Sequence, residues 1–220
     1  MINEKLKMIK SIYHVNCILQ VGSFSDNDLD LFVFSDDIKE YTREVIKEND
    51  CHYDISYISI PILKQGIKEK WPFLVNSLKS YQVLYHKDNQ VLDLLKVINC
   101  LKPEKLNQED INYYRFFINE ELEALNRRLM QPESCFLCYS LFNETLIIFY
   151  KLNQLFIPKA KKIIAGISKI DDKLAEMCYD FILENIIERK MAILNQIIDY
   201  VFKPFGGRLT EWKKGKFPLK

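Results

Sequence analysis

Three aspartates in this chain are spaced as in a divalent-cation site. Asp28 and Asp30 lie two residues apart at the start of an apolar run that continues to Phe34. Successive side chains of a strand point to opposite faces, so this spacing predicts that both carboxylates emerge on one face. Two neighbouring carboxylates repel each other, and a divalent cation between them removes that repulsion. Hard oxygen ligands with this spacing suit Mg²⁺.

A third acid, Asp54, begins the apolar alternation of another strand-like segment, residues 51–61. If the two segments are neighbours in one sheet, Asp54 completes a cluster of three carboxylates able to hold two ions. The structural alternative is that residues 26–28 form a polar turn and that Asp54 only caps a strand. Three acids in this order on two strand-like runs favour the metal site.

Gly22 and Ser23 precede the Asp-x-Asp pair, and this order resembles the nucleotidyltransferase superfamily, whose motif is Gly-Ser, Asp-x-Asp and an Asp on a later strand. The resemblance implies that Gly22 and Ser23 contact nucleotide phosphates and that the three aspartates ligate two Mg²⁺ ions. An acceptor oxygen would then attack the α-phosphorus of a nucleoside triphosphate, with ATP favoured, and pyrophosphate would leave. The intervening loop, residues 24–27, is short and carries no Lys or Arg. Phosphate contacts must therefore come from elsewhere.

The elements that position these residues alternate between strands and helices over the first hundred residues. Strands are expected at 17–21, 29–34, from 54 onward and at 81–85. Helices are expected at 2–14, 38–48, 61–78 and 91–101. The pattern predicts a small mixed sheet with flanking helices, and we assign residues 1–102 to a nucleotidyltransferase catalytic domain.

From about residue 107 the apolar spacing becomes helical, which predicts an antiparallel bundle over residues 103–220 and an α+β fold overall. A catalytic domain followed by a helical substrate-side domain resembles the kanamycin- and lincosamide-type antibiotic nucleotidyltransferases. In several of those relatives the helical part supplies a carboxylate as general base. Glu144 is the candidate here, because it lies inside an apolar helix where burial would raise its pKa. The alternative is that it faces solvent or pairs with a lysine.

Charge argues against a dedicated nucleic-acid binder, since 31 basic and 30 acidic residues give a net charge of +1. The tail from Lys203 to Lys220 is locally basic and contains Trp212 and Phe217. It could contact phosphates, hold an anionic partner such as tRNA, or be a terminal strap packed by its aromatic side chains.

The cysteines and the longest apolar stretch indicate a cytoplasmic location. Six scattered cysteines, mostly in apolar segments, suggest reduced core thiols. Cys135 and Cys138 have the spacing of metal ligands, but no second Cys or His pair lies near them, so we interpret them as core residues. Polar side chains interrupt the apolar stretch 138–157, which predicts a buried helix rather than a membrane span. The first residues lack the features of a signal peptide.

The leading hypothesis is a Mg²⁺-dependent enzyme that transfers a nucleoside monophosphate to a hydroxyl of a small molecule, such as an aminoglycoside or lincosamide antibiotic, and so confers resistance. Its partners would be the triphosphate and that acceptor. Membrane binding is not expected, nucleic acid is not favoured and a homodimer stays open. One alternative is a nucleotidyltransferase of toxin–antitoxin type that modifies a protein or tRNA. Another is a non-catalytic nucleotide-binding module, against which the three mutually repelling aspartates argue.

Overall fold

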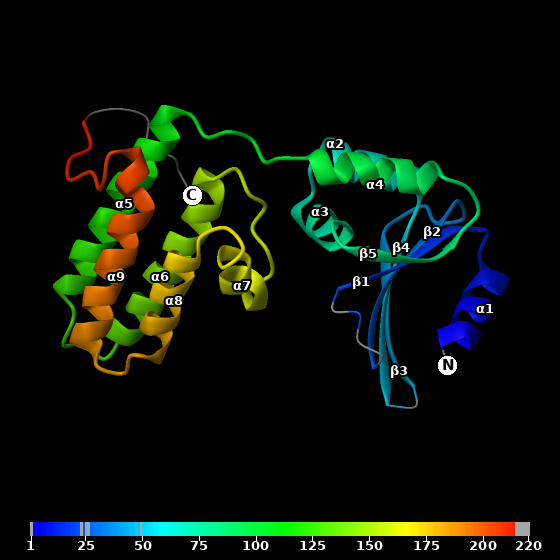
Figure 1. Ribbon diagram of the computed structural model, residues 1–220, viewed down its shortest axis with the longest axis horizontal. Coiled ribbons are helices and arrows are strands. Elements are labelled where there is room, and N and C mark those ends of the chain that lie inside the picture. The colour runs from blue at the N-terminus through cyan, green and yellow to red at the C-terminus, as the bar shows by residue number, and fades with distance from the viewer. Residues whose placement is uncertain (1, 23, 25–26, 49, 214–220) are drawn as a thin grey trace. The chain divides into compact units, whose positions relative to one another are not determined.

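The computed structural model describes residues 2–22, 24, 27–48 and 50–213. The chain forms two compact units, Met1–Leu101 and Lys102–Lys220. Unit 1 contains a mixed sheet with flanking helices, and the described part of unit 2 is helical (Figure 1). The predicted α+β fold class is confirmed.

The sheet of unit 1 has five strands in the order β3-β4-β2-β1-β5. Their bounds are β1 Val15–Val21, β2 Asp28–Ser35, β3 Thr42–Glu48, β4 Cys51–Ile58 and β5 Tyr81–His86. Strands β2 and β4 are parallel, whereas β1 pairs antiparallel with β2 and β5, and β3 pairs antiparallel with β4. The two strands that carry the predicted aspartates are therefore direct neighbours.

The two faces of the sheet are covered by different helices. Helix α1, Ile2–Ile12, packs Ile9 against alternate residues of β2, namely Leu29, Leu31 and Val33. Helices α2 (Ile60–Lys68), α3 (Pro72–Leu78) and α4 (Gln90–Cys100) lie away from α1 on the other side of the sheet (Figure 1). Because strand side chains alternate, burying Leu29 and Leu31 under α1 directs Asp28 and Asp30 to the opposite face.

Two helix predictions in unit 1 were wrong. Residues 38–48 contain the edge strand β3, whose partners run from Thr42 opposite Tyr57 to Glu48 opposite Cys51. In the segment before β3, the Asp37 carboxylate accepts a hydrogen bond from the backbone N–H of His14 at 2.7 Å. The helix predicted over 61–78 is broken into α2 and α3 at Lys70, whose φ is 53°. Pro72 follows closely, and a residue before proline avoids helical geometry.

Unit 2 packs its helices around α6. The bounds are α5 Gln108–Asn126, α6 Ser134–Leu152, α7 Ile163–Ile167, α8 Asp172–Leu183 and α9 Ile187–Phe202. A short 3₁₀ turn, Ala160–Lys162, precedes α7, and a second, Lys203–Phe205, follows α9. Helix α6 has the length and composition of a membrane span, but 50% of its most apolar window is buried, where Leu141, Leu146 and Phe149 join the core. This placement matches the predicted buried helix.

All six cysteines are free thiols, but only four of them lie in the core. Cys17, Cys51, Cys138 and Cys178 are buried, whereas Cys100 and Cys135 are exposed, which corrects the expectation of core positions for those two. Burial raises the pKa of Cys138 to about 11. Its sulfur lies 3.8 Å from the sulfur of Met191. The two thiols of the Cys135–Cys138 pair therefore have different surroundings.

Candidate active site on the sheet

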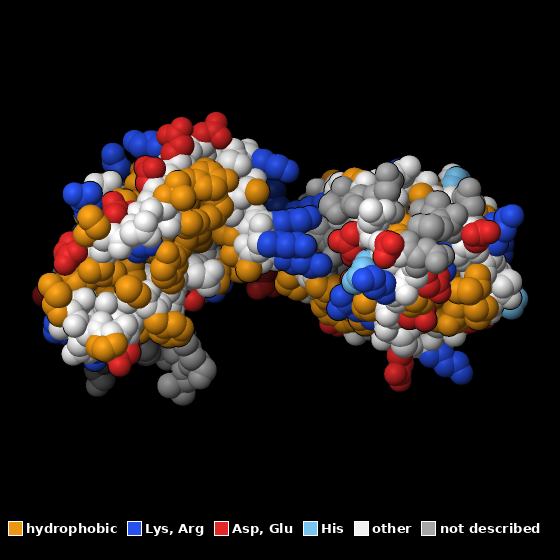
Figure 2. Space-filling view, turned by 90° about the horizontal axis from the view of Figure 1, so that it is seen from below, with side chains coloured by type: hydrophobic (Ala, Val, Ile, Leu, Met, Phe, Trp, Pro, Cys, Tyr) orange, Lys and Arg blue, Asp and Glu red, His pale blue; other side chains and the backbone are white. Residues whose placement is uncertain are grey.

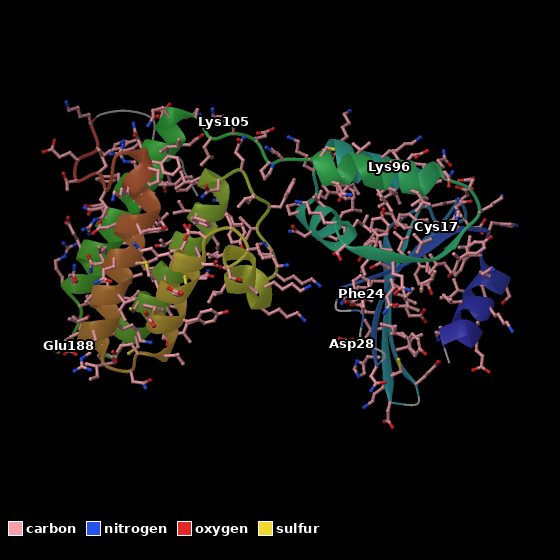
Figure 3. The ribbon with its side chains drawn as sticks, viewed as in Figure 1. Cys17, Phe24, Asp28, Lys96, Lys105 and Glu188 are labelled. Atoms are coloured by element: carbon pink, nitrogen blue, oxygen red, sulfur yellow. The ribbon has the colours of Figure 1, made fainter. Side chains whose placement is uncertain are left out.

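The three predicted aspartates share one face of the sheet. Asp30 of β2 is the register partner of Asp54 on the parallel strand β4, and Asp28 is the partner of His52. Asp28 is exposed, while Asp30 and Asp54 are half-buried. Figure 3 shows Asp28 beside Phe24, away from α1. The parallel pairing of β2 and β4 is thus what brings the three acids together.

Gly22 makes room for the carboxylate of Asp30. It follows β1 with a φ of +85°, in the left-handed region that favours glycine. A Cβ placed on Gly22 would collide with the Oδ2 atom of Asp30. Glycine is therefore required here both by backbone conformation and by space. Ser23, the second residue of the predicted phosphate-binding pair, lies outside the described residues.

The short loop before β2 is tied to β4 by its backbone. The carbonyl of Asn27 accepts from the N–H of His52 at 2.8 Å. Phe24 has a φ of 50° and is exposed. His52 of β4 is the register partner of Asp28 on β2 and of Lys47 on β3. The three side chains therefore lie at the same level of three neighbouring strands.

Arg43 is a residue of this site that sequence reasoning missed. Its Nε and Nη2 atoms donate to the two carboxylate oxygens of Asp54 at 2.7 and 2.6 Å. This hydrogen bonding and the charge of Asp54 raise the pKa of Arg43, and the charge of Asp30 adds to the effect. Arg43 was missed because it lies in the segment 38–48, which was predicted to be a helix. The signal that could have found it is the pattern of β-branched residues Thr42, Val45 and Ile46, which is typical of a strand.

The donor set on this face fits a hard divalent cation at Asp28 and Asp30. Both supply carboxylate oxygens from one face, and Gly22 leaves the space that the Asp30 carboxylate occupies. Asp54 is aligned with them, but both of its oxygens accept from Arg43. Within the described ranges no three His, Cys, Asp or Glu side chains are arranged as a ready metal cluster. A cation held by Asp54 would therefore lie beside the positive guanidinium of Arg43, and this repulsion disfavours Asp54 as a third carboxylate ligand while Arg43 is paired with it.

Glu144, the predicted general base, lies on α6 in unit 2 and is half-buried. The pKa of Tyr113 is raised, chiefly by burial, and the negative charge of Glu144 contributes to that shift. Glu144 forms no ion pair with any described residue. Among the described residues, therefore, it is not paired with a lysine. Its catalytic role stays a prediction.

The described part of the basic tail packs on the helices of unit 2. Arg115 of α5 donates to the carbonyls of Gly207 at 2.6 Å and Gly206 at 2.8 Å. Arg208 pairs with Asp199 at 2.8 Å. The Trp212 ring lies 6.1 Å from that of Tyr113. For residues up to 213, these contacts favour the predicted role of a terminal strap packed by its aromatic side chains. Lys214, Lys216, Phe217 and Lys220 lie outside the described residues.

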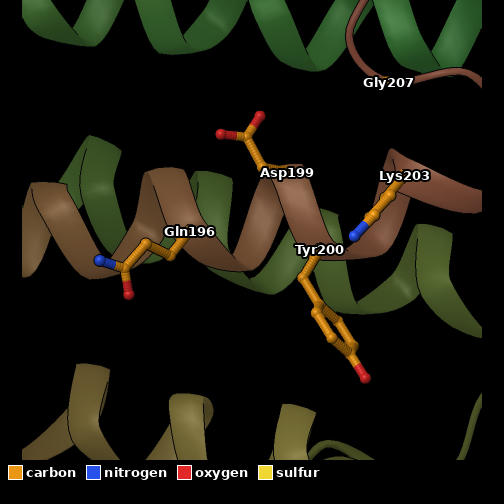
Figure 4. Close-up of a pocket in the computed structure, with 5 residues that line it drawn as sticks. All are labelled: Gln196, Asp199, Tyr200, Lys203 and Gly207. Carbon is orange, nitrogen blue, oxygen red and sulfur yellow. The ribbon is translucent and has the colours of Figure 1, made fainter.

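A separate hollow of about 450 Å³ on unit 2 offers no convergent chemistry. It is lined by Gln196, Asp199, Tyr200, Lys203 and Gly207. Figure 4 shows Asp199 and Tyr200 pointing to opposite sides of α9. Asp199 is already paired with Arg208. None of the predicted site residues lines this hollow.

Comparison with known proteins finds a distant structural similarity. The chain matches no family model and shows no significant match to a curated protein. Among solved structures it is similar to a nucleotidyltransferase-like protein from Exiguobacterium sibiricum, with 11% sequence identity and a TM-score of 0.48. The match covers 91% of this chain and 73% of that one.

Proposed function

We propose that this protein transfers a nucleoside monophosphate from a nucleoside triphosphate, ATP being the first candidate, to a hydroxyl group of a small molecule. The observation that carries the proposal is the parallel register of Asp30 with Asp54 beside Asp28 on one accessible face. Carboxylates brought together from two strands are costly unless a cation or a positive side chain compensates them. A nucleotide–Mg²⁺ complex supplies such a cation.

Each residue of the face has a role in this proposal. Asp28 and Asp30 would hold Mg²⁺, and Asp54 would complete a site for two ions. Bound Mg²⁺ would neutralise the phosphates and the charge that develops on the leaving pyrophosphate. Gly22 would let the backbone approach the phosphates, since it has no Cβ, and Ser23 would donate its hydroxyl.

The acceptor is proposed to be a hydroxylated small molecule of the aminoglycoside or lincosamide kind, and Glu144 is the proposed candidate for its general base. Figure 2 shows acidic and basic side chains interspersed on the visible face of unit 1. This mixture and the net charge of +1 do not favour tRNA as the acceptor. The free thiols suit a reducing compartment, so we propose a cytoplasmic enzyme.

The test is label transfer from radiolabelled ATP with Mg²⁺ to a panel of aminoglycosides, lincosamides, tRNA and proteins. We expect transfer to a small hydroxylated acceptor by the unmodified protein and none by Asp30→Ala. Asp36→Ala is the matched control, because it removes an exposed carboxylate beyond the other end of β2. Labelling of tRNA or protein alone would favour the macromolecular alternative. Absence of both transfer and Mg²⁺-dependent ATP binding would refute the proposal.

A further inference from the structure

Arg43 is placed where it can serve two partners. It lies on β3, which pairs only with β4 within the described sheet, and its side chain is 56% exposed. Its register partner is Ser56, two residues along β4 from Asp54 and on the same face of the sheet. The guanidinium therefore reaches diagonally along the strand to Asp54, while much of its surface stays open to solvent.

The negative charges on this face of the sheet require a positive side chain near any bound triphosphate. Asp28, Asp30 and Asp54 supply three negative charges, and a nucleoside triphosphate would add more. The loop from Phe24 to Asn27 contains no Lys or Arg. On the neighbouring strand β3, Arg43 and Lys47 both occupy the alternation that shares the face of Asp54. Of these two, only Arg43 is shown in contact with the aspartates.

A guanidinium binds carboxylates and phosphates with the same planar pair of N–H donors. The Nε and Nη2 atoms that now donate to Asp54 are therefore the atoms that a phosphate would engage. A phosphate and Asp54 compete for this pair of donors. When a phosphate takes it, both oxygens of Asp54 lose their donor and become available to a cation.

We propose that Arg43 is a nucleotide-phosphate ligand that Asp54 holds in the free protein, so that Asp54 joins the cation site only when a triphosphate takes the guanidinium. This inference rests on the proposed function and adds an order of assembly to it. Without nucleotide, the protein offers one divalent-cation site, on Asp28 and Asp30. With nucleotide, it offers a second that includes Asp54.

The experiment counts bound Mn²⁺ by electron paramagnetic resonance, with and without a non-hydrolysable ATP analogue, and measures affinity for the analogue by calorimetry. The variants are Arg43→Gln and Arg43→Lys, with Lys47→Gln as the matched control, because it removes one positive charge from the same alternation of β3. We expect one Mn²⁺ on the free unmodified protein and two with the analogue. The Arg43→Gln variant should bind two Mn²⁺ ions without nucleotide. It should also bind the ATP analogue at least about tenfold more weakly than the unmodified protein does.

Arg43→Lys should retain part of the analogue affinity because it keeps the charge but loses the paired donors. Lys47→Gln should keep the count of one ion on the free protein. Two ions on the free unmodified protein, or analogue affinity unchanged by Arg43→Gln, would overturn the inference while leaving the proposed function standing. If the unmodified protein binds neither Mn²⁺ nor the analogue, the proposed function itself fails and this inference fails with it.

Discussion

Asp30 of β2 and Asp54 of β4 are register partners across a parallel strand pair, and Arg43 of β3 forms an ion pair with Asp54. We predict that Asp30→Ala keeps the fold and melts at a temperature no lower than the unmodified protein, because it removes repulsion with Asp28. The same variant should lose the Mg²⁺-dependent thermal shift caused by ATP. An unchanged shift would show that Asp30 is not part of a nucleotide site.

Gly22→Ala should lower the free energy of unfolding more than the same substitution does at another glycine with a positive φ. The matched control is Gly207→Ala, since Gly207 has a φ of +75° and no heavy atom within 4 Å of an added Cβ. Left-handed backbone alone costs about 1–2 kcal/mol. At Gly22 the added Cβ also collides with Asp30, and such overpacking costs a further 1–3 kcal/mol or so.

Urea denaturation measures the difference between these two variants. The double variant Gly22→Ala with Asp30→Ala should recover the excess loss, because the Asp30 Cβ lies 3.5 Å from an added Gly22 Cβ, an ordinary contact distance. Equal free energies of unfolding for the two single variants would mean that Gly22 is needed for its backbone alone.

The sequence predicted the two aspartate strands well because their apolar alternation is a local signal with a period of two. Leu29, Leu31 and Val33 are buried together under α1, as that alternation requires. Arg43 was missed for a physical reason. Residues 42–48 form a strand because they pair with β4, and such tertiary pairing overrides the local preference of a segment. Sequence alone could not show that the missing positive charge lies on β3.

Arg115→Gln should destabilise the helical unit. Arg115 donates to the exposed carbonyl of Gly206 and to the half-buried carbonyl of Gly207, and leaving the half-buried carbonyl without its donor costs about 1–3 kcal/mol. Arg127→Gln, which breaks only an exposed pair with Glu123 at 3.9 Å, should cost less than about 1 kcal/mol. Helical circular dichroism during urea denaturation separates the two. A similar small loss in both variants would show that the tail does not stabilise the bundle.

The thiols should divide into two reactive classes. Cys100 and Cys135 are exposed and should be alkylated at about pH 8 in the folded protein. Burial raises the pKa of Cys17 and of Cys178 to about 12, and these thiols should react only after denaturation. Mass spectrometry of the alkylated peptides distinguishes the classes. Rapid labelling of Cys178 in the folded protein would contradict its burial.

The same shifts predict a loss of stability in alkaline solution. A thiol whose pKa is higher in the folded than in the unfolded protein contributes stability fully below the ordinary value of 9.0. That contribution is lost as pH rises from there through about 12, the folded value of Cys17 and Cys178. The melting temperature should therefore fall over this range. Serine at both positions should flatten the decline, and an unchanged slope would assign it to other groups.

Glu144→Gln tests the proposed general base. A base on the acceptor acts in the chemical step, so this variant should lower kcat by about 10²–10⁴ while leaving the KM for ATP unchanged. Glu121→Gln is the matched control, because Glu121 is exposed on α5 and its charge, like that of Glu144, contributes to the raised pKa of Tyr113. If the two variants turn over equally, Glu144 is a half-buried structural residue and the base lies elsewhere.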